Sequence, residues 1–170
     1  AGRALAEKVD LELVLAVDVS GSMDLRELEV QRDGYVAALS HPEVVRAIQS
    51  GYIGKVALVY VEWAGPGLQA VAVPWTVVHD VDSARAFAAA VAAYPVTRKR
   101  GTSISGALAF AAGLFDDNGF EGTRRVIDIS GDGPNNMGVP VLPARDGVLA
   151  RGIVVNGLPL LIRPSLSTAY

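Results

Sequence analysis

The stretch AVDVSGSMD, residues 16–24, places two acids, two serines and a glycine in nine positions directly after an apolar run. Residues 11–17, LELVLAV, are apolar almost throughout, which is typical of a central strand covered on both faces. Asp18, Ser20 and Ser22 follow at every second position and carry hard oxygen donors. Taken alone, they are equally consistent with a strand-end turn and helix cap or with a divalent-cation site.

The amino-acid composition indicates which classes of protein this chain can belong to. The chain has 170 residues, 51% of them hydrophobic and 19% charged, as expected for one globular domain. The net charge of −3 gives no electrostatic reason to expect nucleic acid. The absence of cysteine excludes disulfides and thiolate metal sites. No stretch reaches the roughly 20 apolar residues that a membrane span needs, so we expect no membrane span.

Apolar runs and helical periodicity alternate along the chain. Strands are expected at residues 11–17, 55–63, 68–78, 124–130 and 152–160, all but the third as central strands. Helices are expected from Leu25 with Asp24 as its N-cap, from Pro42, from a cap at Asp80 or Asp82, from Ile104, and between the last two strands. This alternation predicts an α/β sandwich with a mostly parallel sheet. Pro74 and the short AGPG link favour residues 68–78 as an antiparallel edge strand.

Three of the predicted helices have an apolar stripe with a period near 3.6 residues. The stripes consist of Leu25, Leu28, Tyr35, Val36 and Leu39, then Val81, Ala84, Phe87, Ala88 and Val91, and finally Ile104, Ala107, Leu108, Ala111, Leu114 and Phe115.

Oxygen donors recur in three loops that should lie at the carboxyl edge of the sheet, where ligands collect in parallel α/β folds. The second loop, RGTS, contributes Thr102, and the third, SGDGPNN, contributes Asp132. Taken singly, Thr102 fits a helix N-cap and Asp132 a turn, while Asp128 fits a hydrogen-bonded structural acid. Oxygen donors without histidine or cysteine suit Mg²⁺, Mn²⁺ or Ca²⁺. Their joint placement favours a metal site made of Asp18, Ser20, Ser22, Thr102 and Asp132.

Basic residues precede Thr102. Arg98 and Arg100 in the run 98–100 would attract an acidic partner protein, and Asn135 of the third loop is a further candidate for that contact. The alternative for this run is an ordinary solvated loop.

The motifs DVSGSM, GTS and SGDG, in this order and context, resemble the von Willebrand factor A-type (vWA) domain and its metal-ion-dependent adhesion site. The resemblance covers about residues 9–160, and it is closest to a bacterial branch of the family. It implies a Rossmann-like three-layer sandwich with one antiparallel edge strand. It also implies that Ser20, Ser22 and Thr102 supply hydroxyl ligands, and that Asp18 and Asp132 act directly or through water.

This sequence also differs from the usual pattern of the vWA family. Family members normally have a sixth strand and a last helix, so residues 1–170 would form a single vWA-like domain that is incomplete at its C-terminal end and exposes an apolar sheet face. Many members also have threonine before the aspartate of the third loop, where this chain has SGDG.

Binding, not catalysis, is the function that the resemblance implies. A bound Mg²⁺ would accept an acidic side chain from a partner protein, and relatives suggest a periplasmic or secreted location. One alternative is an assembly module in which the metal is only a stabilising clip. The other is a metal-assisted phosphatase-like enzyme, which usually needs a second acid two residues after the first and a lysine for phosphate. Here Ser20 occupies that position, and no lysine lies near the third loop.

Overall fold

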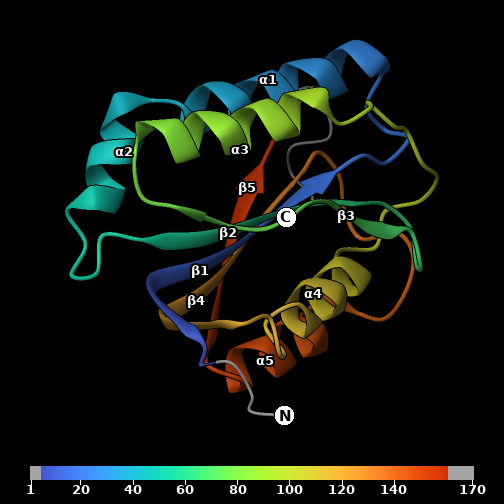
Figure 1. Ribbon diagram of the computed structural model, residues 1–170. Helices are drawn as coiled ribbons and strands as arrows, with labels where there is room; N and C mark the ends of the chain where they lie inside the picture. Colours follow the sequence, from blue (N-terminus) through green and yellow to red (C-terminus); the bar gives the residue numbers. More distant parts are fainter. Residues whose placement is uncertain (1–4, 161–170) are drawn as a thin grey trace.

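A computed structural model of the chain describes residues 5–160, and Figure 1 shows their three-layer arrangement. Helices α1, α2 and α3 cover one face of a central sheet, and α4 and α5 cover the other. The strands are β1 (Glu7–Asp18), β2 (Val56–Trp63), β3 (Gln69–Val78), β4 (Phe120–Gly131) and β5 (Ile153–Pro159). The helices are α1 (Leu25–Leu39), α2 (Pro42–Gln49), α3 (Val81–Ala93), α4 (Ile104–Gly113) and α5 (Val141–Ala150).

The sheet has the strand order β3-β2-β1-β4-β5 within the described residues. β1 pairs in parallel with β2 and β4, and β4 pairs in parallel with β5. β3 pairs antiparallel with β2 at the edge of the sheet, as Pro74 predicted. The predicted fold class is confirmed.

The central position of β1 explains its continuous apolar run. Successive side chains of a strand point to opposite faces. Val14 and Ala16 therefore belong to the core between the sheet and helices α4 and α5. Leu15 and Val17 belong to the core between the sheet and helices α1 and α3. A strand buried on both sides has no polar face.

Side-chain caps fix where the helices start. Asp24 accepts a hydrogen bond from the Glu27 amide at 2.8 Å, and Glu27 accepts one from the Asp24 amide at 2.7 Å. This capping box starts α1 immediately after the serine-containing turn. Asp80, rather than Asp82, is the N-cap of α3. The predicted cap at Asp24 is confirmed.

Two apolar stripes are shorter than predicted. Leu25 is 58% exposed and Val81 is 44% exposed, although both belong to predicted apolar stripes. Each is the first residue of its helix. Because side chains on a helix point back toward its N-terminal end, these two side chains extend past the helix rather than over the sheet.

β5 is also less buried than predicted. It lies at the edge of the described sheet and not in its centre, and Val154 and Leu158 are exposed. On the neighbouring strand, Asp128 accepts a hydrogen bond from Asn156 at 2.8 Å, as expected for a structural acid.

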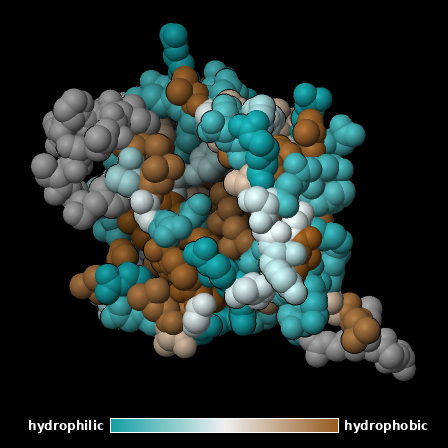
Figure 2. Space-filling model, turned by 90° about the vertical axis from the view of Figure 1, so that its left-hand side faces the viewer, coloured by the Kyte–Doolittle hydropathy of each residue, from teal (hydrophilic) through white to brown (hydrophobic). Residues whose placement is uncertain are grey.

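Figure 2 shows apolar residues gathered around a hollow on the left-hand side of the molecule in Figure 1. That residues 1–170 form a single domain that is incomplete at its C-terminal end stays a prediction.

Among residues 5–160, no helix is both long enough and apolar enough to cross a bilayer.

Candidate metal centre

The serine-containing turn after β1 is the base of the site. Asp18 and Ser20 are both fully buried. The Ser20 amide donates a hydrogen bond to Asp18 Oδ1 at 2.7 Å, and the Ser20 and Ser22 hydroxyl oxygens lie 3.0 Å apart. The turn therefore directs its alternate side chains to one place, as the sequence spacing predicted.

Asp132 reaches this turn from the loop after β4. The parallel register pairs Val17 of β1 with Ser130 of β4, so the two loops leave the sheet side by side. The Ser22 hydroxyl donates to Asp132 Oδ1 at 2.5 Å, across 110 positions of sequence. Asp132 is only 7% exposed. The sequence prediction that these two loops converge is confirmed.

Thr102 lies in a buried loop that is tied to the third loop. Its amide donates to Asn136 Oδ1 at 2.9 Å, and its carbonyl accepts from the Asn136 amide at 3.0 Å. Ser103, and not Thr102, is the N-cap of α4, because Ser103 Oγ accepts from the Gly106 amide at 3.1 Å. The helix-cap interpretation of Thr102 is wrong, which leaves its hydroxyl without that structural task.

Asp18 has the electrostatics of a group that lacks a counterion. Burial raises its pKa to about 6. Hydrogen bonds from Ser20 and from the main chain of Asp132 oppose the shift, and the charge of Asp132 adds to it. Asp18 Oδ2 is buried and has no hydrogen-bond partner among the described residues. Buried polar atoms are nearly always paired, so an orphaned carboxylate oxygen beside two hydroxyls fits a bound cation.

The donor set also indicates which ions fit. The described residues hold no group of three or more histidine, cysteine, aspartate or glutamate side chains arranged for a metal. Two carboxylates with serine and threonine hydroxyls are an oxygen-only set, which suits a hard ion such as Mg²⁺.

The predicted partner-binding residues lie in the same loops but have other contacts. The Arg98 guanidinium donates to the Gly21 carbonyl. Arg100 is exposed, while its carbonyl accepts from the Gly65 amide at 3.1 Å. Asn135 Oδ1 accepts from the Ser105 amide at 3.3 Å, which joins the third loop to α4. A role of these residues in contacting a partner stays a prediction.

Comparison with known families supplies the assignment. The family profile described as "Protein of unknown function (DUF1194)" matches residues 8–169. The chain belongs to this family. A search of curated proteins finds no match.

The fold of this DUF1194 member is similar to the folds of solved vWA-type proteins. Proximal thread matrix protein 1 from the mussel byssus, solved with a zinc-occupied MIDAS motif, has a TM-score of 0.67 at 15% identity; the match covers 91% of this chain and 39% of the mussel protein. An aerotolerance-related membrane protein from Bacteroides fragilis has a TM-score of 0.61 at 25% identity, covering 88% and 67%. The vWA protein from Catenulispora acidiphila has a TM-score of 0.58 at 18% identity, covering 88% and 33%.

The sequence did not predict the role of Asn136 in this DUF1194 domain. Both its amide and its side-chain oxygen bind the main chain of Thr102, so it joins the second loop to the third. The signal available was the Asn-Asn pair after the turn, because asparagine side chains often bind nearby backbone groups.

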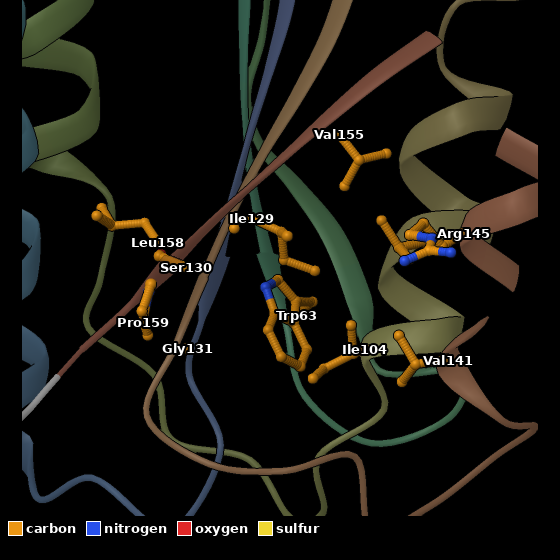
Figure 3. Close-up of a pocket in the computed structure, with 12 residues that line it drawn as sticks. Trp63, Ile104, Ile129, Ser130, Gly131, Val141, Arg145, Val155, Leu158 and Pro159 are labelled. Atoms are coloured by element: carbon orange, nitrogen blue, oxygen red, sulfur yellow. The ribbon is translucent and has the colours of Figure 1, made fainter. Parts of the chain in front are cut away.

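A pocket of about 310 Å³ lies beside the oxygen-rich edge of the domain (Figure 3). Its lining is mainly apolar and comes from β2, α4, β4, α5 and β5, with Ile104, Ile129, Val141 and Val155 among its residues. It reaches Gly131, the residue before Asp132. Its apolar lining distinguishes it from the candidate metal centre.

Proposed function

We propose that this vWA-type domain binds a divalent cation, Mg²⁺ or alternatively Mn²⁺ or Ca²⁺, and uses it to bind an acidic side chain of a partner protein. Ser20, Ser22 and Thr102 would hold the ion through hydroxyl oxygens. Asp18 and Asp132 would hold it directly or through water.

Two neighbouring features carry this proposal. Asp18 Oδ2 is buried without a hydrogen-bond partner among the described residues. In the same turn, the Ser20 and Ser22 hydroxyls are within hydrogen-bond distance, and Ser22 donates to Asp132. The charge of Asp132 adds to the raised pKa of Asp18, so a cation bound beside both carboxylates would be favoured electrostatically. The occupied MIDAS motif named for the mussel protein supports a divalent ion at such an edge.

The donor set also supports partner binding. When bound, a cation held mainly by neutral hydroxyls keeps much of its positive charge for a further carboxylate ligand. Coulomb attraction to that carboxylate is strong at an interface that excludes water. Arg98 and Arg100 add positive charge nearby, and Arg100 is exposed.

Relatives of known structure support an adhesive role outside the cytoplasm. They include the pilus adhesin SpaC from Lactobacillus rhamnosus GG, of which this chain spans only 25%. We therefore propose that this chain is a non-enzymatic interaction domain and that it is periplasmic or secreted. The partner's acidic surface is part of the same proposal.

A metal titration of thermal stability tests the proposed site. A ligand that binds only the folded state at 100 times its Kd stabilises that state by about 2.7 kcal/mol, so millimolar Mg²⁺ should raise Tm relative to EDTA. Ser22→Ala should remove most of this rise because it deletes a hydroxyl in contact with Ser20 and Asp132.

Ser50→Ala is the matched control. The Ser50 hydroxyl donates to the Ala47 carbonyl at the end of α2, so its loss should leave the metal response unchanged. A wild-type Tm that does not move with Mg²⁺, Mn²⁺ or Ca²⁺ contradicts the proposal. A metal-dependent Tm combined with partner capture that persists in EDTA would favour the stabilising clip instead.

A further inference from the structure

The chain before Thr102 packs against the serine-containing turn and is here called the bracing segment, residues 97–102. The Lys99 amide donates to the Val19 carbonyl at 2.9 Å, and Lys99 forms an isolated parallel bridge with Ser20. The Arg98 guanidinium donates to the Gly21 carbonyl. The bracing segment therefore supports the turn that carries both candidate serine ligands.

A buried carboxylate holds the start of this segment. Glu62 of β2 is only 5% exposed, and its Oε2 accepts a hydrogen bond from Thr97 Oγ1 at 2.8 Å. Burial raises the pKa of Glu62, while the Thr97 hydrogen bond and the charges of Lys99 and Arg32 oppose that rise. A buried acid is costly unless it is hydrogen-bonded, so the contact with Thr97 satisfies a real requirement of the fold.

The other end of the bracing segment is held by the residues that follow Glu62. The Gly65 amide donates to the Arg100 carbonyl at 3.1 Å, and the Ser103 amide donates to the Ala64 carbonyl at 2.9 Å. These bonds are made by main-chain atoms. Thr97 to Glu62 is the side-chain contact that fixes the end farther from α4.

We propose that the Glu62–Thr97 hydrogen bond positions the metal centre by holding the bracing segment against the serine-containing turn. Glu62 and Thr97 are positioning residues and not metal ligands, since they act through Lys99, Arg98 and Thr102. This inference rests on the proposed function. It assigns a task to a buried acid that the metal site itself does not use.

Two substitutions of Thr97 test the contact, and a third substitution elsewhere is the control. Thr97→Val keeps the shape of the side chain but removes the donor, and Thr97→Ser restores the donor. Thr76→Val is the matched control, because the Thr76 hydroxyl donates to the Pro74 carbonyl on the edge strand β3. We would measure Mg²⁺ affinity by calorimetry and amide hydrogen exchange of Lys99 in the metal-free protein.

Thr97→Val should weaken Mg²⁺ binding about tenfold and speed exchange of the Lys99 amide by a similar factor, which corresponds to about 1.4 kcal/mol. Thr97→Ser should recover both values, and Thr76→Val should change neither. If Thr97→Val lowers only Tm and binds Mg²⁺ as well as the wild type with unchanged Lys99 exchange, the positioning role is refuted while the metal site stands. A wild type that binds no metal would refute the proposed function, and the positioning role with it.

Discussion

The Asp18→Asn substitution is expected to abolish Mg²⁺ binding and, at pH 7, to make the metal-free domain more stable. Asp18 supplies the buried carboxylate whose Oδ2 lacks a partner among the described residues, and its loss should reduce metal affinity by about 100-fold or more. Without metal, the same carboxylate is destabilising because burial and the charge of Asp132 both disfavour its ionised form. An amide removes that charge and keeps an oxygen for the Ser20 amide.

Asp18→Asn should weaken Mg²⁺ binding but raise the stability of the metal-free domain, so two measurements test it. Titration calorimetry would measure the loss of affinity, and urea unfolding in EDTA would measure the gain in stability. Asp128→Asn is the matched control, since Asp128 lies on β4 and accepts a hydrogen bond from Asn156 away from the candidate ligands. Metal binding that survives in Asp18→Asn would remove Asp18 from the site, and a large fall in metal-free stability would show that Asp18 has a structural partner.

A second large effect is expected in the pH dependence of stability. The pKa of Asp18 is raised from 3.8 to about 6 in the folded state. Between these values the folded state binds a proton that the unfolded state releases, so this group stabilises the metal-free domain as pH falls through 6. The gain levels off near pH 3.8, and its full size is about 3 kcal/mol.

Subtraction isolates this contribution. The free energy of unfolding in EDTA would be measured from pH 4 to pH 8 for the wild type and for Asp18→Asn. Glu62, whose pKa is raised by burial, and Asp10 and Asp80, whose pKa values are lowered by hydrogen bonds, are present in both proteins. Their contributions cancel in the difference. The difference should shrink toward acid pH, and a constant difference would contradict the assigned burial of Asp18.

Saturating Mg²⁺ should reverse this trend. The ion binds the ionised carboxylate, so protons and metal compete, and metal-dependent stabilisation should be lost as pH falls through 6.

Local signals in the sequence predicted the fold and much of the site. The apolar run before Asp18 and Pro74 in the edge strand correctly placed β1 in the sheet centre and β3 at its edge. The alternate spacing of Asp18, Ser20 and Ser22 correctly indicated a turn with converging side chains. These features depend on neighbouring residues, which a sequence pattern can reveal.

Some contacts between residues distant in sequence were missed. The hydrogen bonds of Asn136 to Thr102 and of Thr97 to Glu62 span about 35 positions, and no local pattern indicates them. Ser103 and Thr102 are both suitable N-cap residues by type, and the structure assigns the cap to Ser103. The exposure of Leu25 likewise follows from where the helix starts over the sheet and not from periodicity.

Diffraction from crystals containing Mn²⁺ is the most direct test of the claim that three loops hold one cation. Anomalous scattering would locate the ion without reference to any partner protein. The account predicts a single peak bonded to Ser20 Oγ and Ser22 Oγ at roughly 2.0–2.2 Å, with Thr102, Asp18 and Asp132 around it. No peak at millimolar Mn²⁺, or a peak elsewhere on the domain, would contradict it.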